Sequence, residues 1–532
     1  MMINAIEHNA IPESQYSKKG SRAIEGVLVK VLFFDYLRLN KINGAFAAMD
    51  LMQCFDRMAH PVSALCSQRV GISKNITTTM ISTITSMQHY IRTAYGDSDS
   101  SYGGDSEQPL QGAIQGNAAA SPMFVAISCV LLQFLQSFVQ GFYIQTAITL
   151  TILSIAAVMY VDDTDLLVSA KSHSEPIYFV IKRMQKSIKI WRKGVIQTGG
   201  ALRPEKCKWV LISFKWTRGK WRYESINDNP AKMFLRNSNG NTMELQRMGA
   251  DQGLTGLGVC IAPNGNQVNQ IQSFMDETPG KEGKVASWIK SIRSRHLRPY
   301  DVYLSAFRSI FKSIEYVLPA TSISTSEAKQ VETKLYEVLL PKIGVARKIS
   351  LAYRYSPKRF QGLGCMEIII HQFCEKVKLF LFHANTETQI GKSIKANLES
   401  IHLLIGINKP LFQPPFEKYG FLGETSWIIH LWQMTSFLDV EIQGLYTRPH
   451  IIRKNDFALM ENLIESEVMT NKEIESVNRC RVYLQVQNMS DITNGRGTKI
   501  IQQYLGSCKP CNASTYKWPY FSVKSTINNH IK

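Results

Sequence analysis

The chain has 532 residues, of which 45% are apolar and 19% are charged. This composition excludes a disordered or low-complexity chain, and the length predicts about two to four domains. The net charge is +19, from 61 Lys and Arg against 42 Asp and Glu. Such an excess favours a polyanionic partner, either nucleic acid or an anionic membrane face, over a basic protein that has no such partner.

Cysteine usage and the N-terminus bear on the compartment. Of the ten cysteines only Cys508 and Cys511 have the spacing of a metal-ligand pair, and no second pair follows them. Free thiols in a reducing compartment are therefore favoured over a zinc site. The N-terminal residues lack a signal-peptide layout, and the most apolar segment, 147–161, is too short for a membrane helix. We expect an intracellular protein, nuclear or cytoplasmic, without a transmembrane segment.

The first half of the chain alternates predicted helices with short strands. Residues 21–40 repeat apolar side chains at helical spacing, and 44–52 resemble the end of a buried strand that encloses Asp50. The segment 60–96 is predicted to be helical. Residues 96–109 are rich in Gly, Ser and Asp, which predicts a loop or hairpin. Ser-Pro opens a further predicted helix at 121–139.

The second half begins with a predicted strand pair around 161–163. A basic amphipathic helix is expected at 175–198, and the aromatic and β-branched runs of 208–262 predict strands. From about residue 280 the pattern is helical. A proline cluster after about residue 405 suggests a boundary, and residues 481–497 predict a strand followed by a turn or cap.

The segment AAVMYVDDTDLLV (156–168) contains acids inside an apolar run. Both flanks favour extended structure, so the acids are expected at the tip of a β-hairpin. Adjacent carboxylates repel each other and their pKa values rise unless a cation is present. A divalent metal site and a plain Asp-rich turn are both open interpretations of Asp162 and Asp163. For Asp165 a turn role is favoured over a ligand role.

Two further segments strengthen the metal hypothesis. Asp50 ends an apolar strand, and the aromatic Phe55 follows five residues later. Two sets of strand-end carboxylates are what a two-metal phosphoryl-transfer site requires, and Mg²⁺ prefers few carboxylates together with phosphate oxygens and water. The glycines and alanines of the segment 110–128 leave space close to its backbone. In the same segment, Gln115 supplies an amide that can donate and accept hydrogen bonds.

In this order the segments resemble the reverse transcriptases of non-LTR (LINE-type) retrotransposons. MDLMQCFDRMAHP (49–61) resembles their palm motif A, GAIQGNAAASP (112–122) motif B and YVDD (160–163) motif C. GGALRPEKCKW (199–209) resembles motif D, and LTGLGVCIAP (254–263) resembles motif E, the primer grip. The order A to E and the extent of about 215 residues fit one palm.

The resemblance implies a role for each matching residue. Asp50, Asp162 and Asp163 would be the catalytic acids and would bind two Mg²⁺ ions, with Mn²⁺ as an alternative. The nucleotide-binding residues would be Phe55 as steric gate, Gln115, Gly116 and Lys206. Leu257 and Gly258 would form the primer grip. The partners implied are an RNA template, a DNA primer and deoxynucleoside triphosphates, with no membrane.

The fold implied is α+β, a right-hand polymerase palm with an antiparallel sheet and packed helices, followed by a helical thumb. The expected domains are a remnant of the fingers (1–43), the palm (44–265), a thumb-like region (266–405) and a C-terminal region of unassigned role (406–532). The fingers motifs that grip the triphosphate lie upstream of motif A in the family, and only 49 residues precede Asp50 here. An N-terminally truncated reverse transcriptase domain is therefore expected.

The lead hypothesis is an RNA-directed DNA polymerase of a retroelement. Basic runs at 186–193 and 290–298 would contact the phosphates of the template–primer duplex. The first alternative is an inactive palm–thumb fragment that only binds RNA or DNA. The second is a viral RNA-dependent RNA polymerase, which the aromatic Phe55 and the Tyr160-Val161 pair disfavour.

Overall fold

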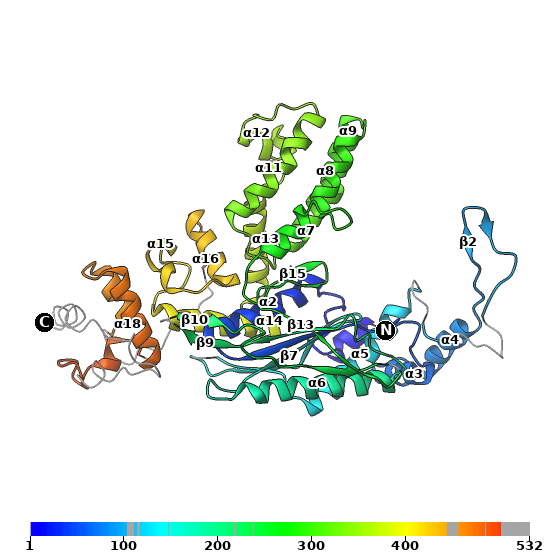
Figure 1. The fold of residues 1–532 in the computed structure, drawn as a ribbon, viewed down its shortest axis with the longest axis horizontal. Coiled ribbons are helices and arrows are strands. Elements are labelled where there is room, and N and C mark those ends of the chain that lie inside the picture. Colours follow the sequence, from blue (N-terminus) through cyan, green and yellow to red (C-terminus); the bar gives the residue numbers. More distant parts are fainter. Residues whose placement is uncertain are drawn as a thin grey trace.

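A computed structural model describes residues 2–103, 111–113, 117–146, 148–217, 220–237, 239–443, 456–484 and 486–501. The expected mixed α+β class is confirmed. In Figure 1 the main sheet lies in the lower part of the molecule, with α6 (Ile177–Gln197) beneath it, α2 (Ala23–Asn40) above it and α5 (Ala120–Phe138) labelled to the right of β7. A helical arm with α8 (Lys284–Ser294) and α11 (Thr325–Lys342) rises from this base.

The main sheet has the strand order β13-β8-β1-β7-β6. Its strands are β1 (Gly44–Met49), β6 (Ala157–Tyr160), β7 (Asp163–Ser169), β8 (Lys208–Ile212) and β13 (Gln246–Met248). The central strand β1 is antiparallel to both neighbours, as is β6 to β7. The expectation of a purely antiparallel sheet is wrong at one edge, because β13 is parallel to β8. Because β13 runs in the same direction as β8, the chain between the two strands crosses back to the end of the sheet at which β8 begins.

Helix α2 explains why the sheet and the helices above it form one body. Its residues are buried on all sides, and apolar side chains occur around most of its circumference. It packs against β6 on one side and against α14 (Gln389–Ile405) and α16 (Trp427–Phe437) elsewhere. Four charged side chains on this helix are buried, and each has an ionic partner: Glu25, Lys30, Asp35 and Arg38.

Most helices lie where the sequence predicts them, notably α2, α5 and α6. The segment 60–96 is helical only in part, as α3 (His60–Arg69) and α4 (Lys74–Thr85), before the hairpin of β2 (Arg92–Thr93) and β3 (Gly96–Asp97). Figure 1 shows this hairpin extended away from the body. The strand expected from residue 481 is wrong at its start, because α18 (Asn471–Leu484) extends over residues 481–484.

Helix α5 is the one helix in the described ranges that is long and apolar enough to cross a membrane, with 56% of its most apolar window buried in the protein. It packs against α3 and α6, and its buried side chains belong to the core beneath the sheet. Packing of this kind is typical of an apolar core helix.

The buried apolar side chains of the described residues form two clusters. The larger one contains the main sheet, α5, α6 and most of α2, and it continues through residues 379–492. The smaller one lies in the rising arm, residues 274–368, and reaches the base through Ile24, Val27 and Val259. The segments after residue 379 therefore share a core with the sheet. The domain boundaries expected at 43/44, 265/266 and 405/406 stay predictions.

Candidate functional site

The acids Asp162 and Asp163 lie at the tip of the β6–β7 hairpin, as the sequence predicts. Tyr160 pairs with Asp163, which leaves Val161 and Asp162 as the two turn residues. Val161 has a φ of 54°, a left-handed conformation that a β-branched side chain disfavours. Asn or Gly normally occupies such a position. The turn thus stores about 1–3 kcal/mol of backbone strain, and strain of this kind concentrates at functional sites.

Asp50 reaches the same end of the sheet from the central strand. Met49, the last residue of β1, pairs with Thr164 of β7, so the register carried one residue further sets Asp50 beside Asp163. The backbone of Asp50 is held by a third segment. Its N–H contacts Cys207 Sγ at 3.4 Å, and its carbonyl accepts the N–H of Arg203 at 3.0 Å.

The charge of Asp162 affects the pKa values of both other acids, Asp50 and Asp163. Burial is the main cause that raises the pKa of Asp50, and the charge of Asp162 raises it further, while Lys206 and Arg203 lower it. Burial, then Asp162 and Asp165, raise the pKa of Asp163. These carboxylates therefore lie close enough to repel each other.

One carboxylate oxygen of these three acids lacks a hydrogen-bond partner. Asp50 Oδ2 is buried and has no hydrogen-bond partner in the described structure, a state that is costly for a carboxylate. An orphaned acceptor beside two further carboxylates fits a divalent cation. In the described ranges no three side chains of His, Cys, Asp or Glu are gathered as ligands of one metal ion, so the role of the acids as metal ligands stays a prediction.

The segment expected to carry the motif D lysine runs beside Asp50. Met52 N–H donates to Ala201 O at 2.8 Å, and Leu51 forms a bridge with Leu202. Lys206 is exposed in the turn after this bridge. Among the charges near Asp50, Lys206 is the one that lowers its pKa most. The lysine is thus near enough for its charge to act on an acid that is far from it in the sequence.

Two cysteines contact the acids, and sequence reasoning missed both. Burial, followed by the charge and hydrogen bond of Asp162, raises the pKa of Cys54 to about 12. Cys54 is therefore a neutral thiol that donates to Asp162. Cys207, which meets the Asp50 backbone, also has a pKa raised to about 12 by burial. The position of Cys54, four residues after Asp50, is the only sequence signal for its role.

Phe55 packs on the core and also holds the start of the glycine-rich segment. Its ring meets Phe124 of α5 edge to face, with 5.7 Å between centroids. Ala113 N–H donates to Phe55 O at 2.8 Å. At Gly112, whose φ is 76°, an added Cβ would lie 2.4 Å from Phe55 O, so only glycine permits this approach. Gln115 and Gly116 lie outside the described residues.

The residues expected to grip the primer form the tip of a second hairpin. The strands β14 (Leu254–Gly256) and β15 (Val259–Ile261) pair through a turn of Leu257 and Gly258, whose φ values of 53° and 77° are typical of a type I′ turn. The hydroxyl of Tyr316 donates to Leu257 O at 2.7 Å. Burial and then Tyr160 raise the pKa of Tyr316, so this hairpin lies near the one that carries the acids.

Asp165 does not take the turn role expected of it. It lies inside β7, opposite Ala48 of β1 and Val158 of β6. Its Oδ2 accepts from Lys30 Nζ at 2.7 Å, and both side chains are largely buried. The expectation failed because the sequence does not reveal that Lys30, 135 residues away, faces this strand.

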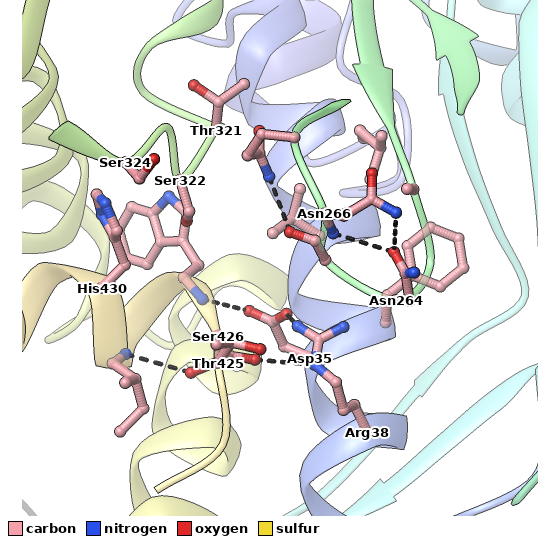
Figure 2. Close-up of a pocket in the computed structure, with 18 of the residues that line it drawn as sticks. Asp35, Arg38, Asn264, Asn266, Thr321, Ser322, Ser324, Thr425, Ser426 and His430 are labelled. Carbon is pink, nitrogen blue, oxygen red and sulfur yellow. Dashed lines mark hydrogen bonds and ion pairs between the residues drawn. The ribbon is translucent and has the colours of Figure 1, made fainter. Parts of the chain in front are cut away.

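A cavity of about 540 Å³ lies apart from these acids. It is enclosed by α2, residues 260–267, residues 320–324 and residues 416–433. Figure 2 shows Ser322, Ser324 and His430 on one side, with Asn264 and Asn266 on the other. Asp35 and Arg38, beneath, bind each other. The charged groups bordering this cavity thus have partners within the protein.

No protein family matches the sequence, and no curated protein is similar to it. Among solved structures, the apo telomerase from Candida tropicalis is similar at a TM-score of 0.35 and 12% identity, over 74% of this chain and 60% of that chain. Two telomerases in complex with a TWJ fragment of telomeric RNA are similar as well. The one from Candida tropicalis has a TM-score of 0.32 and 13% identity, over 74% and 56% of the two chains. The one from Candida albicans has 0.31 and 10%, over 75% and 55%.

This chain thus spans less than two thirds of the length of those telomerase chains. TM-scores this low carry no functional inference, so the function proposed below rests on the residues of this chain.

Proposed function

We propose that the chain is an RNA-directed DNA polymerase domain of a retroelement, of the non-LTR type that its motifs resemble. The observation that supports this proposal is the position of Asp50, Asp162 and Asp163 at one end of the main sheet. These acids come from separate strands, the charge of Asp162 raises the pKa values of the other two, and one buried oxygen among them lacks a partner. A carboxylate group of this kind at a sheet end suits nucleotidyl transfer.

The chemistry divides between the bound metal and the residues of the chain. Asp50, Asp162 and Asp163 would hold two Mg²⁺ ions, which supply Lewis acidity for the attacking 3′-hydroxyl and the leaving pyrophosphate. Cys54 would orient the Asp162 carboxylate through its thiol hydrogen bond. The Lys206 ammonium, close to Asp50, would offset negative charge on the phosphates.

The remaining residues would bind and select substrates. Phe55, whose ring is fixed against Phe124, would crowd a ribose 2′-hydroxyl and so favour deoxynucleotides. The tip of the β14–β15 hairpin, held by Tyr316, would position the primer end. The net charge of +19 favours binding of the template–primer duplex through its phosphates.

A primer-extension assay tests the proposal. The purified chain, given an RNA template, a DNA primer, dNTPs and Mg²⁺, should extend the primer, and the Asp162→Asn, Asp163→Asn double variant should not. A preference for rNTPs over dNTPs would overturn the proposal in favour of an RNA polymerase. Equal background incorporation by the wild type and the double variant, with retained RNA binding, would leave a binding function only.

A further inference from the structure

Lys30 is one of four buried charged residues in α2. The exposed fraction of its side chain is 4%, and a lysine buried so deeply is costly unless it is paired. Its partner is Asp165, with 2.7 Å between Nζ and Oδ2. The proposed chemistry uses neither residue, so this buried pair needs an explanation of its own.

The position of Asp165 relates the pair to the acids. Asp165 lies two residues after Asp163 on β7, so the two side chains share one face of the strand. In the register of the sheet, Asp165 lies in one row with Ala48 of β1 and Val158 of β6. Along their own strands, Asp50, Asp163 and Tyr160 each lie two residues from a member of that row. Lys30 therefore binds the sheet directly beneath the end where the acids meet.

The other side of the Lys30 ammonium faces the second hairpin. A Cβ added to Gly256 would lie 2.9 Å from Lys30 Nζ, and no other heavy atom would lie within 4 Å of it. Gly256 has no positive φ, so its backbone does not require glycine. An added Cβ would instead press on Nζ, whose displacement would disturb the ion pair to Asp165. The ammonium thus lies between β7 and the β14–β15 hairpin.

We propose that Lys30 is a positioning residue that sets the distance between the hairpin of the catalytic acids and the β14–β15 hairpin. Its ion pair joins it to the first hairpin, and its ammonium limits how closely Gly256 of the second hairpin can approach. This inference rests on the proposed function, in which one hairpin holds the acids and the other the primer end. A displacement of about 1 Å between such groups lowers a reaction rate by about a hundredfold.

Gly256→Ala tests the spacing directly, because it adds one methyl group against Nζ and leaves every charge in place. Its matched control is Gly495→Ala, at a glycine that also lacks a positive φ and has open space around its Cβ position. We expect Gly256→Ala to lower kcat at least tenfold while the KM for dNTP changes less than about twofold. The control should retain wild-type kcat. Wild-type kcat in Gly256→Ala, or an equal change in the KM for dNTP, would overturn the proposal.

A second readout does not depend on activity. Lys30→Met with Asp165→Asn removes both charges without leaving either one unpaired, and Lys30→Arg keeps the cation. Hydrogen exchange of the backbone amides should accelerate in both hairpins in the neutral double variant and return towards wild type in Lys30→Arg. Unchanged exchange in β14–β15 would overturn the link between the hairpins. If the wild type fails to extend primers while exchange responds as expected, the proposed function fails and the structural link stands.

Discussion

The backbone N–H of Trp427, at the first turn of α16, donates to Oδ2 of Asp35 in α2 at 2.6 Å. The other Asp35 oxygen binds Arg38, which in turn donates to Pro263 O and Thr425 O at 2.9 and 2.8 Å. Asp35 thus joins the second helix of the chain to a segment 392 residues later. The side chains of Asp35, Arg38 and Trp427 are buried, while Thr425 is exposed.

Replacement of Asp35 by Ala should destabilise the fold strongly. The change leaves the Arg38 guanidinium and the Trp427 N–H buried without their acceptor, a loss that costs about 3–5 kcal/mol. Urea unfolding would measure it. Glu277→Gln, which removes an exposed ion pair with Lys334, is the control and should leave the unfolding midpoint unchanged. Equal midpoints for the two variants would contradict the role of Asp35.

Asp50→Asn should separate activity from stability. Burial and the neighbouring acids disfavour the charge of Asp50, so its neutralisation should raise the free energy of unfolding by about 1 kcal/mol in the absence of metal. The same change should lower the rate of primer extension at least about a thousandfold, because a metal ligand is lost. Thermal unfolding in EDTA and the extension rate are the two measurements. A variant that is less stable than wild type would show that the attraction of Lys206 and Arg203 for the Asp50 charge outweighs its burial and the repulsion from the other acids.

Val161→Asn should relieve backbone strain at the tip of the acid hairpin. Asn tolerates a positive φ better than a β-branched residue does, so the free energy of unfolding should rise by about 1 kcal/mol. Leu150 also has a positive φ, 55°, and is exposed. Leu150→Asn should therefore change stability in the same direction. A loss of stability in both variants would show that side-chain packing outweighs backbone strain.

The stability of the fold should depend on pH through His402. Burial lowers the pKa of this histidine from 6.5 to about 4. Between these values the unfolded chain binds more protons than the native one, so stability is complete above pH 6.5 and falls as the pH drops towards 4. At 1.36 kcal/mol per pKa unit the loss amounts to roughly 3 kcal/mol.

Urea unfolding at pH 7.5 and pH 4.5 measures the effect. His402→Gln retains a donor for Ile407 O, which His402 contacts through Nδ1, and should lose less stability on acidification than the wild type. His8→Gln, at an exposed position, should behave as the wild type does. Parallel losses in all three proteins would show that His402 does not govern the acid dependence.

Phe55→Val should relax sugar selection. The smaller side chain would leave room for a ribose 2′-hydroxyl, so the ratio of kcat/KM for dNTP over rNTP should fall by at least tenfold. Because the ring also contacts Phe124, its removal destabilises the local core, and thermal unfolding must be recorded beside the kinetics. Phe124→Leu, which disturbs the same contact from the other side, should keep the selectivity. A fall in both variants would assign the effect to packing.

Local patterns in the sequence were sufficient to predict the acid hairpin, the strand that ends at Asp50 and the main helices. The structure has them where apolar periodicity and turn residues place them. The contacts of Lys30 and Cys207 were missed, because a single charge or thiol in a segment does not show which distant strand it faces. The one available signal for Lys30 was its position within the apolar run of α2. The continuation of α18 past residue 481 was missed because short apolar runs suit a strand and a helix equally.

The burial of α2 has a consequence for how the chain acquires its structure. This helix leaves the ribosome several hundred residues before two of the helices that cover it, α14 and α16, which begin at residues 389 and 427. During synthesis its apolar surface would stay uncovered until those two helices have emerged. Contacts so distant in sequence are slow to form, and exposed apolar surface promotes aggregation. Production of the protein should therefore benefit from slow translation or chaperones, and shortened chains that end before α16 should be recovered mainly as aggregates.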